Sequence, residues 1–213
     1  MTPGPPCAAP PPRRLRSGSL CTGYGGLDIA VTSVLDAEVA WYAENDPHAA
    51  AVLAARWPGL RNLGDITTLD WATVPPVDLI TAGWPCQDIS YAGPGTGITK
   101  GTRSGLWLHI ADGLRQLRPA YVFLENVAAL RTRGLGTALA SLAEIGYDTQ
   151  WTSLRACDIG SCHRRDRMFI LATRPGTAAR LAAADCPGSR VLQRRGTGGL
   201  LAGPPGPAEE ARP

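Results

Sequence analysis

The chain is poor in charged residues and has almost no lysine. Only 18% of its 213 residues are charged, and Lys100 is the single lysine in the sequence. Low charge together with 44% hydrophobic residues is typical of a globular chain and excludes a largely disordered one. The basic residues are almost all arginine, which suits bidentate contacts with phosphates and planar bases. An excess of Ala, Arg, Gly and Pro also fits a GC-rich genome, and the net charge of +3 permits an anionic partner without requiring one.

Long apolar runs are missing as well. No stretch of about 18 apolar residues is present, so the sequence predicts no membrane-spanning helix and no signal peptide. The six cysteines match no paired zinc pattern, and Cys157, Cys162 and His163 lie close together without a fourth ligand nearby. We therefore expect no metal site, and a cytoplasmic protein with reduced thiols.

Composition divides the chain into three parts. Residues 1–14 are rich in proline and end in two arginines, and we expect a flexible leader there. Residues 15–174 alternate short apolar runs with helix-like stretches, and this length suits one folded domain. Residues 175–213 drift to Ala, Gly, Pro and Arg, and we expect a low-complexity, disordered tail.

The middle part predicts a strand–helix alternation. We expect strands at residues 17–21, 39–43, 62–66, 77–82, 121–124, 149–154 and 168–172. We expect helices at residues 27–35, 47–56, 106–117 and 135–145. Such an alternation favours an α/β fold with a mostly parallel sheet and helices on both faces. Binding sites in these folds lie at the carboxyl ends of the strands.

Glycines or carboxylates follow the first three expected strands. The turn Gly23-Tyr24-Gly25-Gly26 lets the backbone approach a ligand closely, and it lacks the G-x-G-x-x-G pattern of nicotinamide and flavin enzymes. Glu44 follows the second strand and can accept hydrogen bonds from a ribose, and Asp65 follows the third and can accept from an adenine amino group. Singly, each carboxylate fits a helix cap better. Three such features on successive strand ends favour a ligand site.

The fourth expected strand runs into Gly83-Trp84-Pro85-Cys86-Gln87. A thiolate at this edge is a useful nucleophile, although buried structural cysteines are common. The following residues, 91–104, form a glycine-rich stretch whose length is typical of a lid or binding loop.

An acid and two arginines complete the set. We expect Glu125 beside Cys86, because their strands would be neighbours, and an acid there can donate to a ring nitrogen of a base. Strand alternation places Arg165 and Arg167 on one face, although a pair of arginines alone fits a solvated edge better.

In this order, the segments resemble the cytosine-5 DNA methyltransferases over residues 17–174. The most specific motifs are Gly-Trp-Pro-Cys-Gln, Glu-Asn-Val and the Arg-x-Arg that ends His-Arg-Arg-Asp-Arg. The resemblance implies a Rossmann-like class I methyltransferase fold with an antiparallel final strand. It also implies S-adenosylmethionine as cofactor and, as substrate, a cytosine flipped out of duplex DNA.

The resemblance assigns roles to individual residues. Cys86 would attack carbon 6 of cytosine, Glu125 would bind or protonate ring nitrogen 3, Arg165 would contact O2 and Arg167 would steady the site. Cofactor-binding residues would be Thr22, Gly23, Gly25, Gly26, Glu44, Asn45, Asp65, Ile66 and Pro85. Substrate-binding residues would be Gln87, Ser90, Arg103, Asn126 and Val127. Asn45 stands where many relatives carry an aromatic residue, and His163 where they often have Gln.

Two segments of the family have no counterpart in the sequence: the variable DNA-reading region and a glycine-containing segment that completes the cofactor pocket. Three explanations stay open, namely a fragmentary gene model, one half of a split enzyme completed by a complementary chain, and a degraded remnant. The leading function is DNA cytosine-5 methylation in a bacterial restriction or phage setting. Alternatives are tRNA cytosine-5 methylation and an inactive module that binds S-adenosylmethionine or DNA. A thiol enzyme without this cofactor is a weaker reading.

Overall fold

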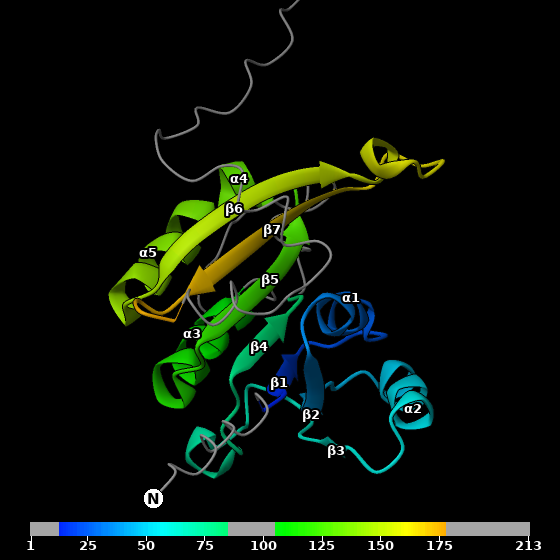
Figure 1. Cartoon of the computed structure of the whole chain (residues 1–213), viewed down its shortest axis with the longest axis vertical. Helices are drawn as coiled ribbons and strands as arrows, with labels where there is room; N and C mark the ends of the chain where they lie inside the picture. The colour runs from blue at the N-terminus through cyan, green and yellow to red at the C-terminus, as the bar shows by residue number, and fades with distance from the viewer. Residues whose placement is uncertain (1–12, 85–104, 178–213) are drawn as a thin grey trace, which may run out of the picture.

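The computed structural model describes residues 13–84 and 105–177. They form one seven-stranded sheet in the order β3-β2-β1-β4-β5-β7-β6 (Figure 1). Its strands are β1 (Leu15–Leu20), β2 (Ala37–Ala43), β3 (Arg61–Asn62), β4 (Leu79–Ala82), β5 (Tyr121–Val127), β6 (Asp148–Arg155) and β7 (Asp166–Thr173). Its helices are α1 (Gly26–Val34), α2 (Pro47–Arg56), α3 (Leu106–Leu117), α4 (Leu130–Arg133) and α5 (Leu135–Ile145), with 3₁₀ turns η1 (Trp71–Thr73) and η3 (Ala156–Ile159).

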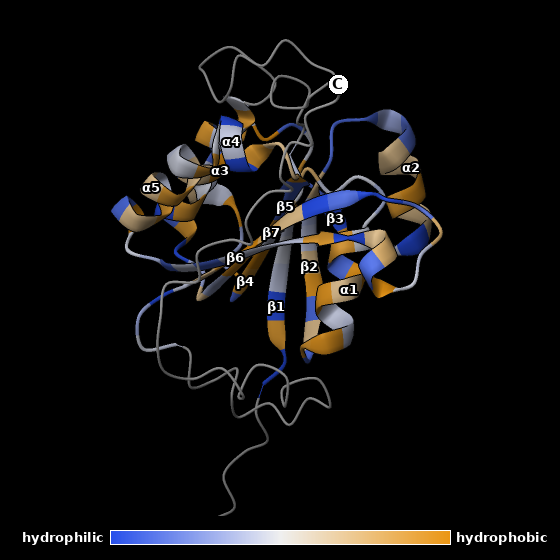
Figure 2. Cartoon of the chain, turned by 90° about the horizontal axis from the view of Figure 1, so that it is seen from above, coloured by the Kyte–Doolittle hydropathy of each residue, from blue (hydrophilic) through white to orange (hydrophobic). Residues whose placement is uncertain are grey.

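The sheet is mostly parallel. Strands β1 to β5 pair in parallel, while β7 pairs antiparallel with both β5 and β6. Helices α1 and α2 lie on one side of the sheet and α3, α4 and α5 on the other (Figure 2). The expected α/β fold, with helices on both faces and an antiparallel last strand in the chain, is confirmed.

The central strands carry the core. All four residues of β4 are buried. Ile80 and Ala82 belong to a cluster with residues of α3 and β5, and Leu79 belongs to a second cluster with Val31 and Tyr121. Strands buried on both faces are characteristically apolar, and the one polar residue of the β4 sequence Leu-Ile-Thr-Ala, Thr81, is buried and donates a hydrogen bond to Asp28. The structure therefore anchors the segment that leads to Cys86 in the most buried part of the sheet.

Local signals set several helix ends as the sequence predicts. Pro47 occupies the first turn of α2, where its missing N–H leaves no bond unmade, and the Asp46 side chain caps the helix by accepting from the Ala49 amide at 2.8 Å. At the end of α5, Gly146 adopts a left-handed conformation with φ of 92°.

The third strand differs from its prediction. It covers only Arg61–Asn62 and not residues 62–66. Gly64 has a φ of 77°, which leaves the extended conformation, and the Asp65 carboxylate accepts from the Thr67 amide at 2.8 Å to close a turn. Asp65 thus lies in a turn after the strand. The short helix α4 and the 3₁₀ turns were not predicted, because they have too few residues to show a hydrophobic period.

Candidate active site

Two cavities adjoin at the carboxyl edge of the parallel strands. The smaller has a volume of about 220 Å³ and the larger about 640 Å³, and both are lined by Cys21, Gly23 and Gly83. The smaller is completed by Ala43, Glu44, Asn45, Gly64, Asp65, Ile66 and Leu106. Its walls therefore come from the ends of β1, β2 and β4, the turn after β3 and the start of α3, where open α/β sheets bind ligands.

The glycine turn connects β1 to α1 across the junction of the cavities. Gly23 and Gly25 have φ values of 56° and 78°, a backbone conformation that residues other than glycine rarely adopt. A Cβ on Gly25 would also lie 2.8 Å from the ring of Trp57. The turn therefore needs glycine at these positions for backbone conformation and, at Gly25, for space.

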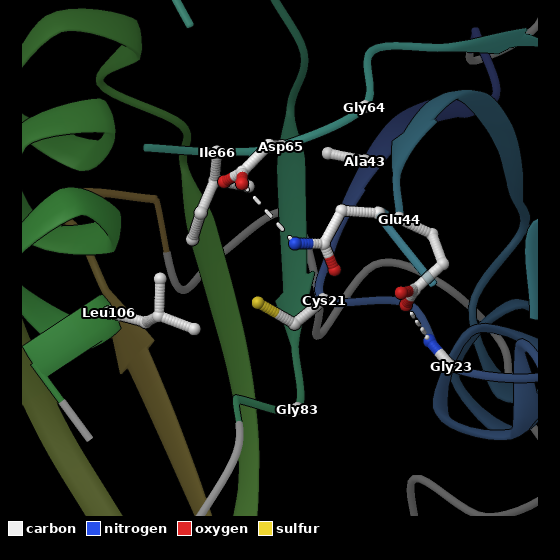
Figure 3. Close-up of a pocket in the computed structure, with 10 residues that line it drawn as sticks. Cys21, Gly23, Ala43, Glu44, Gly64, Asp65, Ile66, Gly83 and Leu106 are labelled. Atoms are coloured by element: carbon white, nitrogen blue, oxygen red, sulfur yellow. Dashed lines mark hydrogen bonds between the residues drawn. The ribbon is translucent and has the colours of Figure 1, made fainter. Parts of the chain in front are cut away.

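Glu44 is held rigidly at the end of β2. It is buried, and its Oε2 accepts from the Gly23 amide at 2.7 Å while Oε1 accepts from the Asp46 amide at 2.8 Å. Figure 3 shows the Glu44 carboxylate beside Gly23 on one wall of the cavity. Because each carboxylate oxygen can accept a second hydrogen bond, Glu44 retains capacity for a ligand hydroxyl.

Asp65 faces the same cavity from the turn after β3. Its Oδ1 accepts from the Thr67 amide, and its Oδ2 accepts from the side-chain amide of Asn45 at 3.3 Å (Figure 3). The hydrogen bond from Thr67 lowers the pKa of the Asp65 carboxyl, so Asp65 is an anionic acceptor at neutral pH. Ile66 and Leu106 supply the apolar wall of this cavity (Figure 3).

Cys21 lies at the junction of the cavities and was not assigned to the site by sequence. It has a φ of 50°, which is unusual for a residue other than glycine, and its sulfur faces the smaller cavity (Figure 3). Burial, with Glu44 and Asp65 nearby, raises the pKa of this thiol to about 12. The thiol is therefore protonated at neutral pH and a poor nucleophile. The sequence feature that could have assigned Cys21 to the site is its position just before the glycine turn.

The larger cavity lies between the glycine turn with α1 and the strands β5 and β7. Glu125, Arg165 and Arg167 line it together, although Arg165 precedes β7 and only Arg167 lies within the strand. Arg167 Nε lies 2.6 Å from Glu125 Oε1, and both side chains are about one quarter exposed. This ion pair fixes the direction of the Glu125 carboxylate across the cavity wall.

Several lining residues of the larger cavity escaped the sequence analysis. Leu154 and Arg155 are the last two residues of β6, Ile159 in η3 is 78% exposed, and Tyr24 in the glycine turn is 64% exposed. Single exposed apolar residues carry no pattern that a sequence could reveal.

The structure does not bring every predicted residue to a cavity. Asn126 is buried and donates from Nδ2 to the Trp84 carbonyl at 3.2 Å, so it ties the end of β5 to the segment that precedes Cys86. Val127 and Gly25 line neither cavity, whereas Thr22 and Gly26 line the larger one. The predicted residues outside the described ranges are Pro85, Cys86, Gln87, Ser90 and Arg103.

Within residues 13–84 and 105–177, no group of three or more His, Cys, Asp or Glu side chains is arranged to hold a metal ion. No helix in the same ranges has the length and apolar character needed to cross a membrane.

Comparison with known proteins places these features in a family. Residues 15–194 match the family model of the C-5 cytosine-specific DNA methylases. The chain is 34% identical over 164 residues to the Type II methyltransferase M2.BsuMI of Bacillus subtilis (strain 168), covering 73% of this chain and 41% of that protein. It is 32% identical over 164 residues to the Type II methyltransferase M.HhaI of Haemophilus parahaemolyticus, covering 75% of this chain and 49% of that protein.

Solved structures share the fold. A DNMT2 of Spodoptera frugiperda aligns with a TM-score of 0.64 at 22% identity, covering 76% of this chain and 50% of that one. A putative DNA modification methyltransferase from an E. coli prophage aligns with a TM-score of 0.59 at 24% identity, covering 75% and 47%. The chain spans about half the length of the curated relatives it matches. By the family match and the relatives, the chain belongs to the C-5 cytosine-specific DNA methylase family.

Proposed function

We propose that this chain transfers a methyl group from S-adenosylmethionine to carbon 5 of cytosine in DNA. The main support is the pair of adjoining cavities at the carboxyl edge of the sheet. One is lined by the carboxylates Glu44 and Asp65, and the other by Glu125, Arg165 and Arg167. A shared junction at the glycine turn allows two ligands to meet there, as transfer between a cofactor and a base requires.

The smaller cavity fits the adenosine part of the cofactor. Glu44 has acceptor capacity for ribose hydroxyls, the ionised Asp65 can accept from the adenine amino group, and Ile66 and Leu106 offer an apolar surface for the purine. The positive φ angle of Gly23, which lines both cavities, allows the backbone to approach the methionine part closely. When bound, S-adenosylmethionine supplies a methyl group activated by its sulfonium.

In the proposed mechanism, the Cys86 thiolate would add to carbon 6 of the flipped cytosine and make carbon 5 nucleophilic toward the methyl group that a bound cofactor would supply, with S-adenosylhomocysteine as the leaving group. Loss of the carbon 5 proton and expulsion of the thiolate complete the reaction. Glu125 holds ring nitrogen 3 and Arg165 holds O2, so that charge arising on the ring is stabilised. Support comes from β4, which leads toward Cys86 and pairs in parallel with β5, the strand that carries Glu125.

DNA is the proposed substrate because the curated relatives are named Type II methyltransferases and the matching model is that of DNA methylases. The test incubates the purified chain with S-adenosylmethionine carrying a labelled methyl group and either duplex DNA or tRNA, and identifies the labelled nucleoside by mass spectrometry. We expect 5-methyldeoxycytidine. Label confined to tRNA would favour the alternative substrate, and no label in a chain that binds the cofactor would favour an inactive binding module.

We also propose a complementary chain as partner, in a restriction–modification setting in the bacterial cytoplasm. The support is that the curated relatives are Type II methyltransferases and that the exposed apolar side chains of Tyr24 and Ile159 line the larger cavity. Mixing this chain with the carboxy-terminal half of such a relative should raise methyl transfer. Equal rates with and without that half would contradict the proposed partner.

A further inference from the structure

Asp28 is a buried carboxyl in the first turn of α1. It is 1% exposed, and its side chain accepts hydrogen bonds from Ser19 Oγ on β1 at 3.0 Å and from Thr81 Oγ1 on β4. Both neighbours are neutral hydroxyls. Within the part of the chain that the structure describes, no arginine, lysine or histidine forms an ion pair with Asp28.

The charges that line the larger cavity are divided between its two sides. Its acidic lining residues are Asp28 and Glu125, and its basic ones are Arg155, Arg165 and Arg167. Glu125 is paired with Arg167, and Arg155 is paired with Asp158 at 3.1 Å. Among the described lining residues, Asp28 is thus the acid without an arginine partner, and it lies on the side of the glycine turn. That side favours a cationic ligand group and the opposite side an electron-rich one.

The fold does not need this charge. Burial raises the pKa of the Asp28 carboxyl, which means that ionisation here opposes folding. A neutral amide of the same shape could still accept from Thr81 and donate to Ser19, so hydrogen bonding alone does not require an acid. A buried acid without an arginine partner on one side of a binding cavity points to an electrostatic role toward a cationic ligand group, which would favour the ionised carboxylate and offset the cost of its burial.

We propose that Asp28 supplies the negative charge that stabilises the sulfonium of S-adenosylmethionine, and so lets the site distinguish this cofactor from its neutral-sulfur product S-adenosylhomocysteine. The inference rests on the proposed function. Its oxygens already accept from Ser19 and Thr81, so Asp28 acts through its field and is a positioning residue. Asp28 is 1% exposed, and solvent weakens the field of a buried charge less than that of a charge in bulk water.

The experiment measures the dissociation constants of S-adenosylmethionine and S-adenosylhomocysteine by calorimetry for the wild type, Asp28→Asn and Asp28→Glu. We expect Asp28→Asn to weaken binding of the sulfonium form roughly tenfold, and to leave affinity for the neutral form within about twofold. Asp28→Glu keeps the charge and should preserve the preference. Glu38→Gln removes an exposed charge on β2 outside both cavities and should leave both constants unchanged.

Circular dichroism verifies folding of each variant, and Asp28→Ser replaces Asp28→Asn if the amide variant does not fold. An unchanged ratio of the two constants in the folded variant overturns the inference, as does an equal loss of both affinities, which would indicate a purely structural Asp28. If the wild type binds neither compound, the proposed function fails instead, because that result does not involve Asp28.

Discussion

At the scale of single residues, the site depends on carboxylates that the backbone holds in place. Glu44 and Asp65 both accept hydrogen bonds from main-chain amides. The backbone therefore fixes the direction in which the carboxylate oxygens can accept further hydrogen bonds from a ligand. A ligand that bonds to such fixed carboxylates causes little further loss of side-chain conformational entropy on binding.

Replacing Asp65 with alanine should weaken binding of S-adenosylmethionine roughly tenfold, because it removes an ionised acceptor that faces the cavity. Calorimetric titration of the purified variant measures the change. Asp70→Ala is the matched control, because Asp70 caps η1 and lines neither cavity. An affinity equal to wild type would remove Asp65 from the cofactor site.

Replacing Arg167 with glutamine should lower the rate of methyl transfer about a hundredfold while leaving cofactor affinity unchanged, since Arg167 orients Glu125 and lines only the larger cavity. Steady-state rates and calorimetry separate the two quantities. Arg115→Gln, which removes an exposed ion pair on α3, serves as control. Loss of cofactor binding together with the rate would mean that Arg167 supports the fold and not the Glu125 geometry.

At the scale of elements, close packing between β1 and β2 shapes the edge that carries the glycine turn. The register of this pair shifts between Ser17 and Gly18, and the Trp41 ring lies against Gly18. Trp41 is buried and donates from its indole nitrogen to the Pro75 carbonyl at 2.9 Å. The missing side chain at Gly18 therefore makes room for an aromatic residue that joins two strands to the segment before β4.

Gly18→Ala should destabilise the protein by about 2 kcal/mol, because a Cβ there would lie 2.2 Å from the Trp41 ring. Denaturant unfolding measures the change. Gly136→Ala is the matched control within α5, where a Cβ meets nothing within 4 Å and should stabilise the helix by about 0.5 kcal/mol. Equal effects of the two substitutions would refute the packing argument.

At the scale of the whole molecule, the buried carboxyl of Asp28 couples stability to pH. Its pKa is raised in the folded state, so the folded protein binds this proton more tightly than the unfolded chain does. The free energy of unfolding therefore falls as pH rises from the unfolded value near 3.9 through the folded pKa. The contribution of protonated Asp28 to the free energy of unfolding is fully present below the unfolded pKa and is lost above the folded pKa.

Asp28→Asn should consequently unfold at a higher temperature than wild type at neutral pH, and the difference should shrink as pH falls toward 4. Thermal melts of both proteins across this range provide the measurement. A difference that does not vary with pH would show that ionisation of Asp28 is not coupled to folding.

Much of this molecule could be predicted from sequence, for reasons that differ by region. The apolar β4, the cap at Asp46 and the left-handed Gly146 are local signals, and strand alternation then places Glu44 and Glu125 on one edge. The short β3, the ion pair between Arg167 and Glu125 and the unpaired Asp28 depend on tertiary contacts that no local pattern encodes. Sequence thus located the edge of the sheet but not the distribution of charge within it.

Covalent trapping is the sharpest test of methyl transfer through Cys86. The chain is mixed with S-adenosylmethionine and DNA that carries 5-fluorocytosine in many sequence contexts. The fluorine cannot leave as a proton does, so the enzyme stalls while attached to the base. We predict a DNA adduct on Cys86 by mass spectrometry and none in Cys86→Ala. A folded, cofactor-binding chain that forms no adduct, or forms one at another residue, would contradict the role of Cys86 as the nucleophile.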